Sequence, residues 1–97
     1  MKFFSQLDKA FESRVRLGVM SVLLVNDWVA YTELKDLLDL TDGNLASHLS
    51  ALEKIEYVEV RKEFVGKKPK TSYRVTAIGK SAFQNHLKAL EEMIKRA

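Results

Sequence analysis

The chain has no cysteine, only one proline and only four glycines among its 97 residues. Without cysteine there are no disulfide bonds, thiolate metal ligands or cysteine nucleophiles, so we expect the fold to depend on its apolar core. Long apolar runs are missing too, and the apolar start at Phe3 and Phe4 is followed at once by polar residues. A membrane-spanning helix needs about 18 apolar residues, and a signal peptide needs an apolar centre. We therefore expect a cytoplasmic protein without a membrane partner.

The remaining composition is typical of one small globular domain spanning residues 1–97. Apolar residues make up 46% of the chain and charged residues 30%, which is the mixture of a folded, soluble protein. No repeat or linker interrupts the sequence. It also has no Ser-His-Asp set, paired carboxylates or phosphate-binding loop in the context that catalysis requires. We therefore expect no enzymatic activity.

Apolar residues at spacings of three and four predict helices in the first half of the chain. The pattern over residues 4–23 predicts a short N-terminal helix followed by a longer one that ends near residues 26–27, with Ser13 as a cap inside the run. Residues 28–31 look like a short strand, in which Trp28 is expected to pack against the core. Thr32 is placed to cap a brief helix over residues 33–38.

A second helix is predicted from Asp42 to Ile55, with Thr41 as its N-cap. Together with residues 33–38 it forms a helix-turn-helix pattern. An apolar stripe would face the core at Leu45, Leu49 and Leu52. The opposite face is small or hydrogen-bonding, unlike the Lys, Glu and Gln of ordinary solvated helices, at Gly43, Asn44, Ser47, His48, Ser50 and Ala51. Such a face can enter a groove of DNA; the alternative is a plain exposed helix face.

The apolar period changes to two after Tyr57, which predicts strands near residues 58–64 and 71–75. The turn between them would use Gly66 to Lys70, including the single proline. Residues 61–74 carry six basic side chains and one acidic one, whereas residues 1–60 carry six basic and ten acidic. This basic hairpin is either a solvated loop or a phosphate-binding surface. Thr76 can cap a last helix over residues 77–96.

This order of elements predicts a mainly α fold with a small β component. It is that of a winged helix-turn-helix, with a three-helix core, a two-stranded wing and flanking N- and C-terminal helices. In such a fold the recognition helix, here residues 42–55, lies in the major groove of double-stranded DNA. The basic wing, residues 61–74, would lie against the DNA backbone or the minor groove.

The residues that support this reading also resemble a known family. The run Thr41 to Leu49, with Leu52-Glu53 and Tyr57-Val58, closely resembles the recognition-helix region of small winged helix regulators related to the ArsR and MarR groups. Residues 64–76, with Gly79, are similar to that family's wing and the start of its last helix. The resemblance covers residues 32–83, and it implies a homodimer, a pseudopalindromic DNA target and a role in regulating transcription.

One feature of those relatives is missing. Many ArsR relatives sense metals through cysteines in the helix before the recognition helix, and residues 33–38 contain none. His48 and His86 have no second histidine three or four residues away, and a metal site needs three or four converging ligands. We therefore expect no metal and no other cofactor, and the sequence marks no effector site.

The predicted DNA contacts fall into three groups. Base contacts are expected from Asn44, Ser47 and His48, because asparagine can pair with adenine and the other two can donate or accept. Residues that support the recognition helix are Thr41, Asp42, Gly43 and Ser50. Phosphate contacts, which position a protein without reading sequence, are expected from Lys67, Lys68, Lys70 and Arg74.

The two ends of the chain, about residues 1–25 and 77–97, carry more apolar surface than a domain of this size is expected to bury. We expect a homodimer interface there, formed by Phe4, Leu7, Phe11, Phe83, Leu87, Leu90 and Ile94. The alternative is that these residues complete the core of one protomer. A second reading of the whole chain is a winged helix adaptor, whose basic wing meets an acidic protein rather than DNA.

Overall fold

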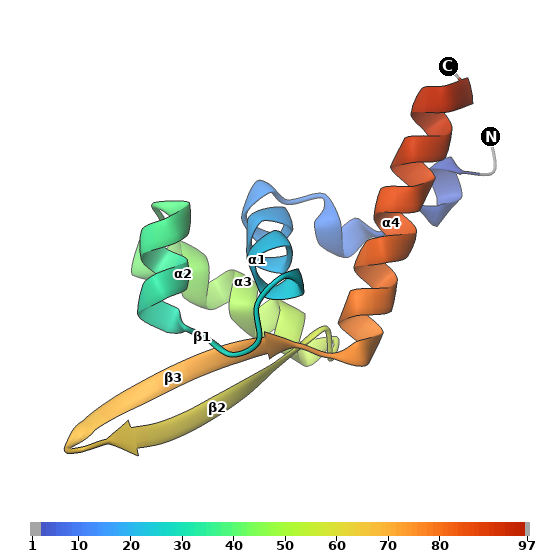
Figure 1. Cartoon of the computed structure of the whole chain (residues 1–97). Helices are drawn as coiled ribbons and strands as arrows, with labels where there is room; N and C mark the ends of the chain where they lie inside the picture. The colour runs from blue at the N-terminus through green and yellow to red at the C-terminus, as the bar shows by residue number, and fades with distance from the viewer. Residues whose placement is uncertain (1–2, 97) are drawn as a thin grey trace.

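The computed structural model describes residues 3–96. Two short 3-10 helices, Phe4–Gln6 and Lys9–Phe11, precede α1 (Arg14–Leu24), β1 (Val29–Ala30), α2 (Tyr31–Leu38), α3 (Asp42–Lys54), β2 (Val58–Val65), β3 (Lys68–Val75) and α4 (Ala77–Arg96). Helices α1, α2 and α3 form the body, the β2–β3 hairpin projects from one end, and α4 projects from the other (Figure 1). The molecule is elongated, 54 × 25 × 21 Å. This is the winged helix-turn-helix architecture that the order of elements predicted.

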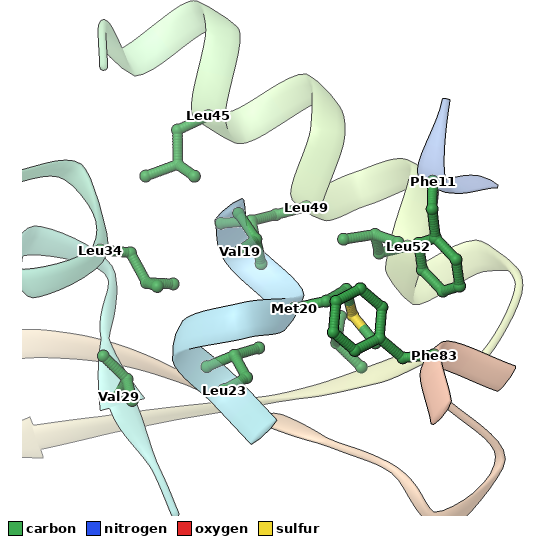
Figure 2. Packing of buried hydrophobic residues seen from close by; sticks show 11 residues of the cluster. Phe11, Val19, Met20, Leu23, Val29, Leu34, Leu45, Leu49, Leu52 and Phe83 are labelled. Atoms are coloured by element: carbon green, nitrogen blue, oxygen red, sulfur yellow. The ribbon is translucent and has the colours of Figure 1, made fainter. Parts of the chain in front are cut away.

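The core lies where α1 crosses α3, with α2, β1 and the start of α4 closing its sides (Figure 2). Its fully buried side chains include the predicted stripe of α3 and three residues of α1, namely Leu45, Leu49, Leu52, Val19, Met20 and Leu23. Phe11 and Phe83 also belong to it, being 1% and 3% exposed, with ring centroids 5.1 Å apart and edge to face. These two residues were expected at the dimer interface. That assignment is corrected, because a side chain buried within one protomer offers no surface to another.

Three of the four predicted helix caps are confirmed. The hydroxyl groups of Ser13, Thr41 and Thr76 each accept a hydrogen bond from the backbone N–H three residues later, at 3.3, 3.3 and 2.9 Å. The cap at Thr32 is wrong. Helix α2 begins at Tyr31, two residues before the predicted start at Glu33, and its N-cap is Ala30, which has no side-chain acceptor. The predicted strand over residues 28–31 is accordingly shortened to its middle two residues.

The sheet has three strands in the order β1-β3-β2, one more than the predicted wing. β1 joins it by pairing antiparallel with residues 72–73 of β3. The hairpin turn is shorter than expected, since only Gly66 and Lys67 lie between the strands, and Gly66 has a φ of +67° that favours glycine. Pro69 lies in β3 opposite Phe64. It is tolerated there because β1 does not extend alongside this part of β3, so no neighbouring strand needs its missing N–H.

The N-terminal segment is fastened to two distant elements. Asp8, extended between the two 3-10 turns, donates its backbone N–H to Nδ1 of His86 on α4 at 3.0 Å. The hydroxyl of Tyr57, just after α3, donates to Oδ2 of Asp8 at 2.6 Å. The short helix predicted at this end is therefore two 3-10 turns. Their path is set by these long-range bonds as well as by local periodicity.

Helix α4 has two different sides along its 20 residues. One side packs inward through Phe83, His86 and Ala89. Leu87, Leu90 and Ile94 are exposed, although they are apolar. Within residues 3–96, no helix combines the length and the apolar character that crossing a lipid bilayer requires.

Candidate nucleic-acid interface

The outer face of α3 is accessible along the residues that were predicted to contact DNA. Asn44 and Ser47 are exposed and His48 is partly exposed, while the buried leucines of the opposite face fix the rotation of the helix. The predicted supporting residues Thr41, Asp42, Gly43 and Ser50 are exposed as well. Ser47 donates its hydroxyl to the Asn44 carbonyl at 3.2 Å. The Asn44 side-chain amide bonds to no other group in residues 3–96, so its donors and acceptor are free for a ligand.

Gly43 has no packing role in the protomer. A methyl group added there would have no heavy atom from elsewhere in the described chain within 4 Å. Its backbone is ordinary α-helix, because the positive-φ glycine of the described chain is Gly66. A glycine in the first turn of a helix lowers helix stability relative to alanine. Neither packing nor backbone geometry within the described chain requires a glycine at this position.

Asp42 joins the two helices of the helix-turn-helix. The hydroxyl of Tyr31, at the start of α2, donates to the Asp42 carbonyl at 3.1 Å and to its Oδ1 at 3.2 Å. Nζ of Lys35 lies 3.2 Å from the other carboxylate oxygen, and this ammonium group lowers the pKa of Asp42. A carboxylate in the first turn of a helix also interacts favourably with the helix dipole and so stabilises the helix. Tyr31 and Lys35 were missed from sequence, because only the turn between α2 and α3 brings them to Asp42.

The hairpin turn, taken together with the first three residues of β3 (residues 66–70), carries cations without counter-ions among the described residues. Lys67, Lys68 and Lys70 are exposed, and none of them forms an ion pair with another described residue. In Figure 1 the N-terminal end of α3 and the hairpin turn both lie at the left, at the end of the molecule away from α4. The two features that the interface hypothesis needs therefore share one end of the protein.

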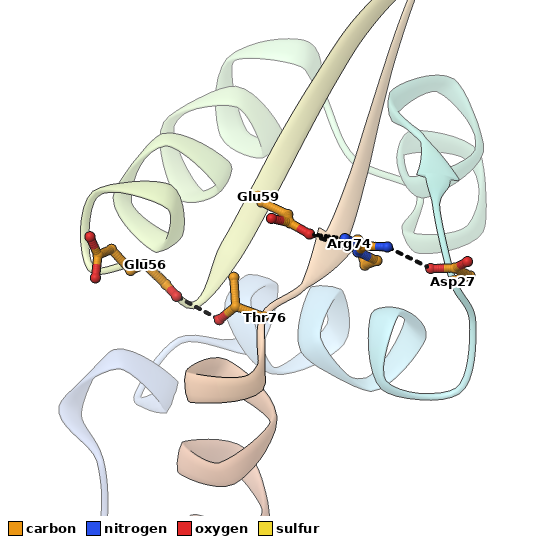
Figure 3. Close-up of polar contacts among 5 residues, drawn as sticks. All are labelled: Asp27, Glu56, Glu59, Arg74 and Thr76. Carbon is orange, nitrogen blue, oxygen red and sulfur yellow. Dashed lines mark hydrogen bonds and ion pairs between the residues drawn. The ribbon is translucent and has the colours of Figure 1, made fainter.

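Arg74 differs from the three lysines. It lies at the base of the hairpin, where Nε donates to Glu59 at 2.7 Å and Nη1 lies 3.6 Å from the Asp27 carboxylate (Figure 3). The bond to Glu59 raises the pKa of Arg74. Its guanidinium also lies over the Trp28 ring, 4.4 Å from the centroid, as does that of Arg61.

Within the protomer, Arg74, predicted as a phosphate contact, has a structural role. Two carboxylates already neutralise its charge, and its contacts fasten the hairpin to residues 27–28. Beside it, the hydroxyl of Thr76 donates to the Glu56 carbonyl at 2.6 Å, which holds the start of α4 to the turn after α3 (Figure 3). Sequence alone could not reveal the role of Arg74, because Glu59 reaches it only through strand register and Asp27 only through the path of the chain before β1.

Several apolar side chains of α4 and of the N-terminal turn are left exposed. Phe4 is 69% exposed and Ile94 76%, while Leu87 and Leu90 are 42% and 38% exposed. Leu7 is partly buried. These residues are the part of the predicted dimer interface that the protomer leaves uncovered. Within residues 3–96, no three carboxylate, imidazole or thiol groups lie close enough together to hold a metal ion.

Comparison with known proteins identifies this architecture. A family model described as a winged helix DNA-binding domain matches residues 15–94. An uncharacterised protein of Methanocaldococcus jannaschii, MJ0432, is 34% identical over 87 residues, which cover 90% of this chain and 95% of that protein.

Solved structures agree. The transcriptional regulator homologue protein from Pyrococcus horikoshii OT3 is 28% identical, with a TM-score of 0.81 over 98% of this chain and 96% of that one. AbfR, in a crystal structure of its overoxidised form bound to DNA, shares the fold at 17% identity, with a TM-score of 0.67 over 97% of this chain and 79% of that one. The family match confirms the resemblance to small winged helix regulators noted from residues 41–58 and 64–79, and an ArsR family transcriptional regulator shares the fold at 16% identity, with a TM-score of 0.59 over 99% of this chain and 94% of that one.

Proposed function

Since the chain belongs to the winged helix DNA-binding domain family, we propose that it is a sequence-specific, double-stranded DNA-binding regulator of transcription that acts as a homodimer. The N-terminal half of α3 enters the major groove, and the hairpin turn contacts the DNA backbone or the minor groove beside it. The protein acts by binding, without catalysis of its own, and in the cytoplasm.

The observation that carries this proposal is the pairing of two features at one end of the molecule. One is an exposed helix face with small and hydrogen-bonding side chains, and the other is a hairpin turn with three lysines that lack counter-ions. A groove-reading element beside a phosphate-binding element is the arrangement by which winged helix proteins hold DNA. AbfR, which shares the fold, is bound to DNA in its crystal structure.

Each residue has a defined role in this proposal. Asn44 pairs with an adenine edge, and Ser47 and His48 donate to or accept from neighbouring bases. Gly43 allows the helix backbone to approach the DNA closely. Lys67, Lys68 and Lys70 contact phosphates and set the register of the protein on the duplex without reading its sequence.

The dimer follows from the exposed apolar side chains of α4 and of the N-terminal turn. Phe4, Leu87, Leu90 and Ile94 pack against the same residues of a second copy, so that twofold symmetry presents two α3 helices together. Such a dimer binds a pseudopalindromic site whose half-sites are about one helical turn apart.

Two measurements on the whole chain test the proposal. Selection of bound duplexes from a random pool should enrich an inverted repeat. The affinity for that duplex should then fall log-linearly with salt, and changing Lys67, Lys68 and Lys70 to Gln should shallow the slope by about 0.9 for each lost phosphate contact. The matched control changes Lys9, Lys80 and Lys88 to Gln, which removes the same charge elsewhere on the surface.

The outcomes separate the two readings of the fold. An unchanged slope in the hairpin variant, beside an unchanged control, would reject the contacts assigned to the three lysines. Failure to enrich any duplex would reject sequence-specific DNA binding and favour an adaptor that meets an acidic protein.

A further inference from the structure

The two faces of the β2–β3 hairpin are electrostatically different. Side chains alternate between faces along a strand, so Glu59, Arg61 and Glu63 share the outer face with Arg74. On this face each arginine has a carboxylate partner, because Arg74 binds Glu59 and Arg61 lies 3.6 Å from Glu63. The two arginines of the outer face are therefore paired, whereas Lys70, which lies opposite Glu63 on the same face, forms no ion pair with a described residue.

The inner face has one cation without such a partner. Along β2 this face carries Val58, Val60, Lys62 and Phe64, so that a lysine interrupts an otherwise apolar row. Val58 is buried in the core. Lys62 is exposed and forms no ion pair with any described residue. Packing does not require a lysine there, and no carboxylate in residues 3–96 is paired with it.

Lys62 lines a hollow between the hairpin and the start of α2. This hollow has a volume of about 450 Å³. It is lined by Ala30, Tyr31, Thr32, Lys62, Pro69, Lys70, Thr71 and Tyr73. Thr71 lies directly opposite Lys62 in the strand register, and Thr32 approaches from α2. Figure 1 shows the start of α2 lying over the hairpin beside β1.

The chemistry of this hollow differs from that of its neighbours on the described surface. Its lining includes two lysines and no carboxylate. Four other hollows of similar size each include a carboxylate, from Asp27, from Glu92, from Asp39, and from Glu53, Glu56 and Glu59 together. The hydroxyls of Thr32 and Thr71 make no hydrogen bond within residues 3–96, so both are free to donate to an anion.

We propose that the hollow between α2 and the hairpin seats one phosphate group of the DNA backbone, with Lys62 supplying the charge and Thr32 and Thr71 supplying hydroxyl donors. Lys70 also lines this hollow, although the strand register places it opposite Glu63 on the other face of the hairpin. This inference rests on the proposed DNA-binding function and names a contact between the groove-reading helix and the hairpin turn. This phosphate-binding hollow, the seat, holds one phosphate by α2 and by both strands of the hairpin. It therefore fixes the angle between the groove-reading helix and the hairpin on the duplex.

The salt dependence of duplex binding tests the seat. Changing Lys62 to Gln should reduce the magnitude of the log-log slope by about 0.9, the value for one lost phosphate contact. Changing Lys62 to Arg should restore the slope, and changing Lys80 to Gln on α4 should leave it unaltered. Lys62 and Lys80 are both exposed, so all three variants are expected to fold, which circular dichroism and a thermal melt will verify.

Duplexes with one neutral methylphosphonate at a defined position locate the contact. At one position in each half-site, the neutral group should weaken binding of the unmodified chain but have no further effect on the Lys62→Gln variant. Elsewhere it should weaken both proteins equally. This coupling would assign the seated phosphate to Lys62.

The outcomes distinguish the seat from the proposed function. If the unmodified chain binds its duplex but the Lys62→Gln slope is unchanged, or no position is coupled to Lys62, the seat is rejected and the DNA-binding function stands. If no duplex binds, both are rejected. An NMR titration with inorganic phosphate identifies the source of the anion: saturation below 1 mM at residues 32, 62 and 71 would assign the hollow to free phosphate and overturn the backbone assignment.

Discussion

At the scale of single residues, two helical glycines differ in the space around them. A methyl group at Gly79, in α4, would lie 2.1 Å from the Tyr57 carbonyl oxygen, so any side chain there collides with backbone. Gly43, in α3, faces open space. Packing therefore accounts for Gly79 but not for Gly43, where the proposed function assigns the glycine to close approach of DNA.

The substitution Gly43→Ala separates stability from binding. We expect the free energy of unfolding to rise by about 0.5 kcal/mol, because alanine has the higher helix propensity. We expect affinity for the selected duplex to fall, because the added methyl group obstructs the close approach of the helix. Urea unfolding and duplex titration at a fixed salt concentration measure the two effects.

Ser81→Ala, at an exposed position of α4, is the control for helix propensity alone. It should leave duplex affinity unaltered. Equal affinity for the Gly43→Ala protein and the unmodified chain would contradict close approach at this position.

At the scale of elements, the structure depends on a few polar bonds between segments that are distant in sequence. Arg74 ties the hairpin to the residues before β1, Asp42 ties α3 to α2, and Asp8 ties the N-terminal turns to α4 and to the end of α3. Each lies where two elements meet at the edge of the core. These bonds orient elements whose apolar packing alone would allow some rotation.

The bond between Tyr57 and Asp8 predicts a pH dependence of stability. The Asp8 carboxylate accepts this hydrogen bond and raises the pKa of Tyr57 from 10.0 to about 12. Because the folded chain keeps the phenol proton longer than the unfolded chain, this contribution is complete below about pH 10. It is lost as the pH rises toward 12.

Tyr57→Phe should therefore lower the free energy of unfolding by about 1 kcal/mol at pH 8, since it removes one partly buried hydrogen bond. The difference between the two proteins should shrink between pH 10 and 12. Urea unfolding of both proteins at each pH cancels the titration of the lysines that they share. A difference that stayed constant across this range would show that Tyr57 and Asp8 are not coupled in solution.

At the scale of the whole molecule, the two ends present different surfaces. One end presents the exposed α3 face and the lysines of the hairpin turn, and the other presents the uncovered apolar residues of α4 and the N-terminal turn. A dimer formed through the apolar end leaves both basic ends free. This separation allows dimerisation and DNA binding to be tested independently.

Ile94→Glu tests the apolar end. Ile94 is 76% exposed in the protomer, so the change should leave its secondary structure intact while placing a charge in the dimer contact. We expect sedimentation equilibrium at micromolar concentration to show a dimer for the unmodified chain and a monomer for the variant. Gln84→Glu adds the same charge at another exposed position of α4 and should remain dimeric. A dimeric Ile94→Glu protein would exclude this part of α4 from the interface.

Much of the fold could be predicted from sequence, because the signals are local. Helical spacing identified α1, α3 and α4, hydroxyl residues marked three helix starts, and a change of period marked the hairpin. These patterns depend on neighbours within a few residues of each other, which interact by the same rules in any chain. The exposed face of α3 followed directly from them.

Other features were decided only by tertiary structure. The burial of Phe11 and Phe83, the carboxylates around Arg74 and the third strand all depend on segments far apart in sequence. The position of Lys62 in the hollow beside α2 was also decided by tertiary structure, because its sequence neighbours alone show only another lysine of a basic hairpin. The amino-acid sequence by itself determined which elements form and which face of each helix is apolar. Strand register and the path of the chain decided which charges are neutralised and which remain free, because ion pairing requires atoms to meet in space.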